Sequence, residues 1–526
     1  SQLASFLKRC NLFISNDSGP VHIAAAVGVP VVAIFGRNQA GLSPLRWGPL
    51  GKNTIIMWNA VIRNIAWLLG GEVFSRLTRA ALVIYAARIL GVTEWGVLSY
   101  GLSLAALLTI ATDIGISASI TKISASEDFN QTERDKYVTA GLIIKIILMI
   151  VAAFGFSLYI DAMQAPISHL MFLGLTALVM ADTFRNLIVA ILRSMRKMRV
   201  EAINNGLVQV LILGLGIYVL KFLGASAENL VFAYALGSLM GLIWLIIYLK
   251  HQRGWNLIFD SKKIWHLLTI SWPFALLGIL GSINLNIDTL MIEKMKTLYD
   301  VGLYGAAQKL ILILYSFPAL IAAGVFPEFA KFAKGSGPEF GKLLKTSLVL
   351  CMMAALPLFL NGAYLAPQII TLIYGVEYLP AYTTLQILLL SLLINFPATI
   401  LGNALFAHDK QKEFVKFAIL GVVGNLVFNT LLIPRFGIAG AAYSTVITQI
   451  LGNAFLWSKI SEINNFGISK ELNKTLLANA MTFGLVVLLA YLKINLLLII
   501  PFAVLVYGII LLILKEEVVL GLWMKK

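Results

Sequence analysis

The sequence predicts an all-α polytopic membrane protein with a short α/β fragment at its N-terminal end. Hydrophobic residues make up 59% of its 526 residues and charged residues only 13%, whereas soluble domains contain about a quarter charged residues. The basic residues that produce the net charge of +16 lie in short clusters between long apolar runs. This distribution is typical of cytoplasmic membrane loops and argues against nucleic-acid binding.

Fourteen apolar runs are long enough to cross a bilayer, whose core of about 30 Å requires roughly 20 helical residues. The predicted transmembrane helices are 62–88, 93–117, 137–160, 167–192, 202–221, 229–249, 264–292, 300–325, 343–372, 380–406, 412–433, 437–458, 475–492 and 495–514. The loops and adjoining ends after the even-numbered helices, with the C-terminal tail, hold 24 Lys and Arg, against 6 after the odd-numbered helices. Because basic residues accumulate on the cytoplasmic side, both termini are predicted to be cytoplasmic.

A faint internal repeat indicates two lobes of six helices each, followed by two extra helices. The segment "TEWGVLSYGLSL" at 93–104 aligns with "YDVGLYGAAQKL" at 299–310, which preserves an acid, a glycine and the final leucine at an offset of 206 residues. The loops "FLGASAENL" and "RFGIAGAAY" also resemble each other. Two lobes in the same orientation suit alternating access around a central cavity.

Three charged residues of the first helix, Glu72, Arg76 and Arg79, share one helical face. In one interpretation, Glu72 and Arg76 form an ion pair that only neutralises itself. In the other, two guanidinium groups and one carboxylate leave a surplus positive charge that suits a phosphate group. Lys309 in the eighth helix would add a charge to this anion site, or its side chain would snorkel to the outer interface.

Other polar residues at membrane depth are candidates for cavity and ion-coupling groups, because charges there are costly. Asp113 would face the cavity or form an ion pair between helices. Asp288 would hold a coupling cation or be hydrated near the outer interface. Asn425 and Asn429, one helical turn apart, would contact the hydroxyl groups of a sugar or join helices by hydrogen bonds.

The membrane part resembles the polysaccharide flippases, the O-antigen and repeat-unit exporters of a superfamily that also contains multidrug antiporters and the lipid II flippase. The resemblance covers about residues 57–520. It is carried by "LGGEVFSRLTRAALVIYAARILGVTEWGVLSYGLSL", "SWPFALLGILGSINLNIDTLMI", "VGLYGAAQKL" and "GNLVFNTLLIPRFGIAGAAYSTVITQILG". It implies movement of an undecaprenyl-diphosphate-linked oligosaccharide across the bacterial cytoplasmic (inner) membrane, driven by a cation gradient. The matching positions for holding the diphosphate are Arg76, Arg79 and Lys309.

The N-terminal stretch "SNDSGPVHIAAAVGVPVVAIFG" predicts a strand, a polar loop, a helix from about Pro20 to Val27 and a second strand. With "RWGP" at 46–49, it resembles the ADP-heptose:lipopolysaccharide heptosyltransferases, which have a GT-B fold. The resemblance maps a sugar-nucleotide-binding run onto Asp17, Ser18, Gly19 and His22 in this sequence. It covers only about 55 residues, so we expect a vestigial donor-domain fragment that is not catalytic alone. Met57 offers a natural start for the membrane part.

The predicted domains are therefore a glycosyltransferase fragment at 1–56, an N-terminal lobe at 57–258, a C-terminal lobe at 259–460, and two peripheral helices with a tail at 461–526. The leading interpretation is a transporter that makes no bond, with the lipid bilayer, a polysaccharide polymerase and glycosyltransferases as partners. Alternatives are a heptosyltransferase with a membrane anchor and a multidrug cation antiporter. No cofactor is predicted, and the separated Cys10 and Cys351 indicate neither a disulfide nor a metal site.

Overall fold

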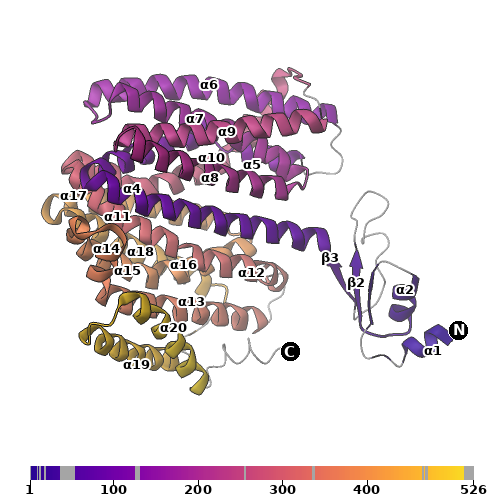
Figure 1. Cartoon of the computed structure of the whole chain (residues 1–526). Coiled ribbons are helices and arrows are strands. Elements are labelled where there is room, and N and C mark those ends of the chain that lie inside the picture. Colours follow the sequence, from indigo (N-terminus) through magenta and orange to yellow (C-terminus); the bar gives the residue numbers. More distant parts are fainter. Residues whose placement is uncertain are drawn as a thin grey trace.

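The computed structural model describes residues 2–8, 10, 13–16, 19–35, 54–124, 131–253, 256–333, 338–464, 467 and 472–514. A long helical bundle follows a small α/β unit, and the two are joined by one helix (Figure 1). The α/β unit comprises α1 (Gln2–Leu7), β1 (Phe13–Asn16), α2 (Gly19–Ala26), β2 (Val31–Phe35) and β3 (Thr54–Trp58).

The helical bundle begins with α4 and ends with α20. Its elements are α4 (Asn59–Asp113), α5 (Ile116–Ser124), α6 (Gln131–Met163), α7 (His169–Ser194), α8 (Met198–Phe222), α9 (Ala227–Arg253), α10 (Ser261–Met295), α11 (Leu298–Leu314), α12 (Ser316–Phe332), α13 (Pro338–Tyr364), α14 (Ala366–Tyr374), the 3₁₀ helix η1 (Val376–Ala381), α15 (Tyr382–Leu390), α16 (Leu392–Ala407), α17 (Gln411–Phe436), α18 (Ile438–Ser461), α19 (Leu472–Tyr491) and α20 (Leu496–Ile513).

The α/β unit has the strand, helix and strand order that the sequence predicts. Its three strands form a parallel sheet in the order β1-β2-β3, and Val21 and Val31 are buried in a small apolar core. Strand β3 crosses the domain boundary expected after residue 56, because Met57 pairs with Ile34 in β2. Helix α4 begins directly after β3, so no linker separates the sheet from the first membrane helix.

Twelve helices within the described residues are long and apolar enough to cross a membrane. One of them, Gly70–Asp113, contains the first two predicted spans, and α4 bends between these spans at Gly91, whose φ is 73°. Helix α18 matches the twelfth predicted span and has 24 residues, although it is not among those twelve. The twelve helices and α18 together account for all fourteen predicted spans.

The helices form two lobes. Helices α6 to α9 lie on one side of α4 and α12 to α16 on the other, and α19 and α20 lie at the edge beyond α13 (Figure 1). Helix α4 packs against α7 and α8 in the first lobe and against α10 and α11 in the second, and α10 also contacts α5, α6 and α17. The lobe interface therefore lies along α4, α10 and α11.

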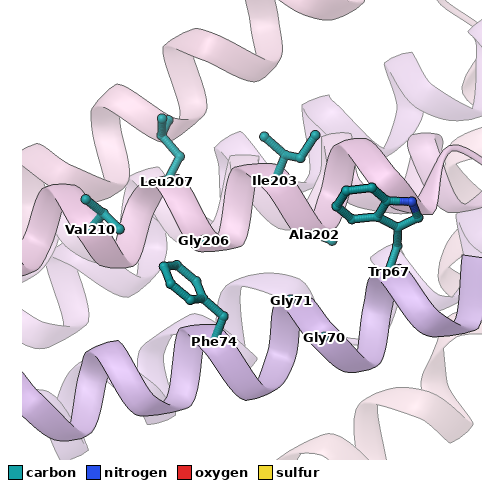
Figure 2. Close-up of a pocket in the computed structure, with 9 residues that line it drawn as sticks. All are labelled: Trp67, Gly70, Gly71, Phe74, Ala202, Ile203, Gly206, Leu207 and Val210. Atoms are coloured by element: carbon teal, nitrogen blue, oxygen red, sulfur yellow. The ribbon is translucent and has the colours of Figure 1, made fainter.

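Helices α4 and α8 pack closely at one point and leave a groove beside it. A Cβ at Gly71 would lie only 2.8 Å from the Cβ of Ala202, so the helix backbones nearly touch there. The adjacent groove has a volume of about 670 Å³. Trp67 and Phe74 of α4 and Leu207 of α8 are among its lining residues (Figure 2).

The two lobes are in contact at the distal end of the bundle, which we define as the end where α4 bends and α11 begins. A Cβ at Gly96 would lie 1.9 Å from the carbonyl oxygen of Leu298, and a Cβ at Gly302 would lie 2.0 Å from that of Val92. Only glycine permits so close an approach of two backbones. These two residues are the equivalent glycines of the sequence repeat.

Hydrogen bonds join the lobes at the same end. Arg88 of α4 donates from Nε to the carbonyl oxygen of Ile373 at 2.7 Å and from a terminal nitrogen to that of Leu372. Tyr378 of η1 donates its hydroxyl proton to the carbonyl oxygen of Ala87 at 2.8 Å. The distal end is therefore closed by backbone contact and by side chains that hold the ends of helical segments.

Candidate functional site

The three charged residues predicted on the first helix lie on α4, but they are not equivalent. Arg76 Nε donates to Glu72 Oε1 at 2.7 Å, and both side chains are about half exposed. The ion pair of Glu72 with Arg76, one of the two interpretations of the sequence, therefore forms, and it compensates the charge of Arg76. Arg79 donates from Nε to the amide oxygen of Gln209 on α8 at 3.5 Å, and this neutral partner leaves its charge uncompensated.

Lys309 on α11 brings a second cation to this region. Lys309 and Arg79 are close enough for their charges to interact, although they belong to different lobes. Within the described part of the chain, neither has an ion-pair partner. Lys309 stands eleven residues after Leu298, about 16 Å along the helix, which is too far for its side chain to snorkel to the start of α11. The two cations face one interface.

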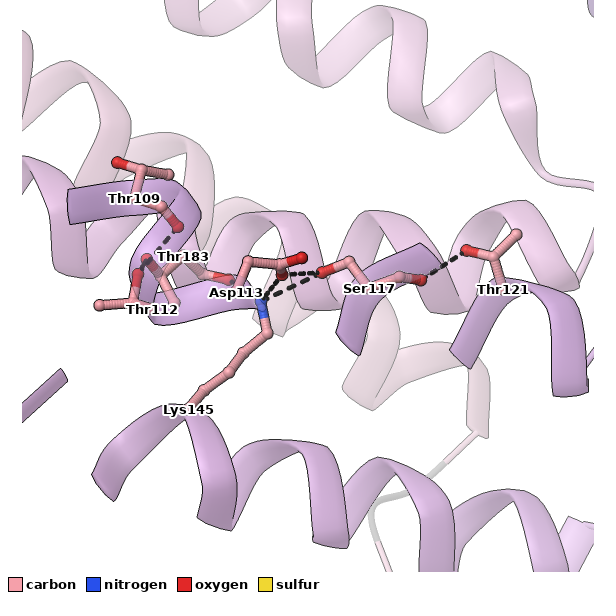
Figure 3. Close-up of polar contacts among 7 residues, drawn as sticks. All are labelled: Thr109, Thr112, Asp113, Ser117, Thr121, Lys145 and Thr183. Atoms are coloured by element: carbon pink, nitrogen blue, oxygen red, sulfur yellow. Dashed lines mark hydrogen bonds and ion pairs between the residues drawn. The ribbon is translucent and has the colours of Figure 1, made fainter. Parts of the chain in front are cut away.

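Asp113 lies in an ion pair between helices (Figure 3). Its carboxylate pairs with the ammonium group of Lys145 from α6, which is fully buried. Lys145 also donates to the Ser117 hydroxyl at 3.1 Å and to the Thr183 carbonyl at 2.9 Å. Asp113 therefore joins α4, α5, α6 and α7, as its structural interpretation predicted, and its coupling role stays a prediction.

Replacing Lys145 by methionine is expected to destabilise the protein by about 3–5 kcal/mol, because it leaves the partly buried carboxylate of Asp113 without its partner. The additional replacement Asp113→Asn should restore most of the loss. Thermal unfolding in detergent measures both effects, with Lys136→Met as a control at a more exposed ion pair, where about 1 kcal/mol or less is expected. Equal stability of Lys145→Met and the parent protein would contradict a structural role.

Asp288 on α10 is buried, with 3% of its surface exposed. It accepts hydrogen bonds from Tyr304 Oη at 2.5 Å, Asn429 Nδ2 at 2.7 Å and Thr445 Oγ1 at 3.0 Å. Hydration at the outer interface, one of the two interpretations of Asp288, is therefore wrong. The carboxylate instead connects α10, α11, α17 and α18, and its charge is held by three neutral donors.

A polar cavity of about 130 Å³ lies beside Asp288 in the second lobe. Asn425 lines it and accepts a hydrogen bond from Ser444 at 2.9 Å. The amide oxygen of Gln449 and the hydroxyl of Thr448 also belong to lining residues, and both atoms are buried without a hydrogen-bond partner among the described residues. The cavity wall thus combines one carboxylate with free oxygen atoms, which suits a proton or a small hard cation.

Sequence reasoning selected Asp288, Asn425 and Asn429 for this region and missed Tyr304 and Thr445. Tyr304 lies within the repeated "VGLYGAAQKL" segment, where the repeat drew attention to the glycines. Thr445 stands four residues before Gln449 and therefore on the same face of α18. This spacing is the one signal in the sequence that could have pointed to Thr445. The hydrogen bonds that Tyr304 and Thr445 donate to Asp288 join different helices and therefore depend on tertiary packing.

The predicted sugar-nucleotide residues lie near the start of α2. Asp17 and Ser18 lie outside the described residues. Gly19 is the first residue of α2, and the His22 side chain is exposed on that helix. Nucleotide binding at these positions stays a prediction.

The fold and the two polar regions define a polytopic membrane transporter built from two helical lobes. The model of the polysaccharide biosynthesis protein family matches residues 61–333, and that of glycosyltransferase family 9 (heptosyltransferase) matches residues 1–65. The first match covers more than half of the chain. The chain therefore belongs to the polysaccharide biosynthesis protein family.

Two curated relatives and one solved structure resemble most of the chain. "Probable low-salt glycan biosynthesis flippase Agl15" of Haloferax volcanii is 24% identical over 70% of this chain and 76% of its own length. "Capsular polysaccharide biosynthesis protein CapF" of Staphylococcus aureus is 21% identical over 74% of this chain and 97% of its own. The structure "Lipid II flippase MurJ, inward closed conformation" has a TM-score of 0.72 and 18% identity, and it covers 86% of this chain and 99% of that one. This likeness shows a shared fold.

Proposed function

We propose that this flippase of lipid-linked oligosaccharides holds the diphosphate of its cargo between Arg79 and Lys309. The observation that carries the proposal is that Arg79 has the neutral Gln209 as its side-chain partner, and that neither cation forms an ion pair within the described residues. Two like charges in a low-dielectric interface repel, and an anion that bridges them removes the cost. Arg76 contributes less, because Glu72 already compensates it. The cargo is an undecaprenyl-diphosphate-linked oligosaccharide, the repeat unit of a surface polysaccharide.

Transport by alternating access explains why the anion site lies between the lobes. A diphosphate and several sugars cannot cross hydrocarbon unshielded, since each unsatisfied polar group costs several kcal/mol there. The lobes enclose the polar head while the lipid tail remains in the bilayer. The protein lowers this barrier and makes no bond. The contact between α4 and α11 then represents the state closed at the distal end.

The cavity beside Asp288 is the proposed site of cation coupling. Asp288, Asn425 and Asn429 lie together there, and the cavity also presents the unpartnered oxygen of Gln449. Binding of a proton or a metal cation would compensate the buried carboxylate and change the packing of α10 against α17 and α18. A cation gradient would in this way bias the lobes between their two arrangements.

The basic loops support the proposed orientation in the bacterial cytoplasmic (inner) membrane, with both termini in the cytoplasm. The α/β unit at the start of α4 would then lie at the cytoplasmic side. It lies within the residues that the glycosyltransferase family 9 model matches. The lobes are proposed to divide near residue 258, and polysaccharide polymerases and glycosyltransferases are the proposed partners.

Replacing Arg79 by glutamine is expected to weaken diphosphate binding about ten-fold to a hundred-fold, since a hydrogen bond to a charged group contributes about 1.5–3 kcal/mol. Lys309→Gln should have a similar effect, and the double variant should abolish surface polymer in a flippase-deficient strain. Lys416→Gln serves as the control, because it removes a positive charge from an exposed side chain on α17. Normal polymer from the double variant, at normal membrane levels, would remove the diphosphate site.

A further inference from the structure

A polar network lies inside the first lobe, between α7, α8 and α9. The guanidinium of Arg185 on α7 donates from one terminal nitrogen to Asp182 Oδ1 at 2.9 Å and from the other to Asn205 Oδ1 on α8 at 3.3 Å. The hydroxyl of Ser238 on α9 also donates to Asp182 Oδ1, at 2.7 Å. We call these four residues the polar network. Its one carboxylate and one guanidinium compensate each other, so the network is neutral overall.

Two helices connect the polar network to the proposed anion site. On α8, Asn205 precedes by one turn Gln209, which accepts the hydrogen bond of Arg79. On α9, Ser238 follows Tyr234 by one turn, and Tyr234 is close enough to Arg79 for the guanidinium charge to act on its hydroxyl group. Residues four apart on a helix share one face and lie about 6 Å apart along its axis. The network therefore lies one helical turn from the surroundings of Arg79.

The accessible part of the polar network faces away from the lipid. The Asp182 side chain is 28% exposed, whereas Arg185 is more buried. Leu173, an exposed apolar residue of the same helix, stands nine residues before Asp182, which is two and a half turns, so the two side chains point in opposite directions. Asn186 is exposed four residues after Asp182 and extends the polar face. Because the face of Leu173 suits lipid, the polar face of α7 points into the bundle.

The carboxylate of Asp182 keeps one oxygen for a ligand. Both of its donors bind Oδ1, and Oδ2 accepts no hydrogen bond within the described residues. A carboxylate oxygen suits hydroxyl donors, because hydrogen bonds to an ionised acceptor are about twice as strong as neutral ones. The amide of Asn186 adds a donor and an acceptor beside it. Since the network is neutral overall, it suits an uncharged ligand with several hydroxyl groups better than an anion or a cation.

We propose that the polar network and Asn186 bind the first sugar of the lipid-linked oligosaccharide through neighbouring hydroxyl groups on its ring. The inference rests on the proposed function. In such a lipid, the first sugar is bonded to the terminal phosphate, so it must lie directly beside any group that binds the diphosphate. The network supplies hydroxyl-binding groups at this place, one helical turn from the surroundings of Arg79. Arg79 and Lys309 then bind the diphosphate that all such lipids share, and Asp182 and Asn186 contact the sugar, which differs among them.

Two variants test the contact with the sugar. Asp182→Asn keeps the shape of the side chain and an oxygen for Ser238, but it removes the charge that strengthens a hydrogen bond from a sugar hydroxyl. Asn186→Ala removes an exposed amide and breaks no ion pair, so it is expected to fold even if Asp182→Asn does not. Asp161→Asn and Asn473→Ala are the matched controls, because both side chains are exposed on other helices, α6 and α19.

The experiment measures binding of undecaprenyl diphosphate, with and without one N-acetylglucosamine, to the full chain in nanodiscs. The parent protein is expected to bind the sugar-bearing lipid about ten-fold more tightly than the sugar-free lipid. Asp182→Asn should weaken binding of the sugar-bearing lipid about ten-fold, because a hydrogen bond to a charged group is lost, and Asn186→Ala about three-fold. Both variants should bind the sugar-free lipid as the parent protein does. The two controls should match the parent protein for both lipids.

The outcomes separate this inference from the function on which it rests. Equal binding of the two lipids by the parent protein would overturn the sugar site, and so would unchanged binding of the sugar-bearing lipid by both Asp182→Asn and Asn186→Ala. Equal weakening of both lipids by these variants would assign the residues a role in packing around Arg79 and would also overturn it. Arg79→Gln is expected to weaken both lipids. Unchanged binding of the sugar-free lipid by Arg79→Gln would instead overturn the anion site itself.

Discussion

Replacing Gly302 by valine is expected to hold the distal ends of the two lobes apart and to abolish transport. A Cβ at this position would lie 2.0 Å from the carbonyl oxygen of Val92, and the obstacle is backbone that no rotamer change can move. With valine at this position, α11 has to move away from α4, so this end of the bundle cannot close. Gly96→Val should act in the same way, because its Cβ would meet the Leu298 carbonyl at 1.9 Å.

The distance between the lobes is the direct measurement for this prediction. Spin labels at Thr93 and Tyr299, both exposed, report it in a background with Cys10 and Cys351 replaced. Gly302→Val should shift the distance distribution to longer values. Gly324→Val is the control, since a Cβ there would meet no atom within 4 Å. An unchanged distribution together with normal transport would show that the two backbones do not need this contact.

The sequence predicts much of this interface, and physical reasons explain which parts it predicts and which it does not. Hydropathy and basic-residue counts indicate the spans because the bilayer imposes length and polarity on each helix separately. The repeat indicates that residues 96 and 302 are equivalent. It does not indicate that each approaches the other's helix, because the contact depends on how the two lobes dock.

In the candidate site too, the sequence predicts contacts within one helix but not contacts between helices. The charges of Glu72, Arg76 and Arg79 can be placed on one face from their spacing alone, and the local pair of Glu72 with Arg76 follows from it. The approach of Arg79 to Lys309 required the lobes to be assembled. Asp113 and Lys145 both stand out as charges within spans, yet their pairing across 32 residues is a tertiary contact.

Asp288→Asn is expected to remove the response of transport to a cation gradient while leaving diphosphate binding intact. The asparagine keeps the shape of the side chain and one acceptor oxygen for Tyr304 and Thr445, but it carries no charge that a cation could compensate. Asp288 is buried beside the polar cavity of the second lobe, whereas the proposed diphosphate site lies between the lobes. The two functions should therefore separate in this variant.

Flipping of a fluorescent lipid-linked oligosaccharide in proteoliposomes, with imposed proton or sodium gradients, measures the coupling. Flipping by the parent protein should be faster under one of these gradients, and Asp288→Asn should keep the flipping rate observed without a gradient. Asp300→Asn is the control, because this carboxylate caps α11 in the same lobe and lies outside the cavity. A gradient response retained by Asp288→Asn would place coupling elsewhere and leave Asp288 a purely structural role, in which its three donors only join α10 to its neighbours.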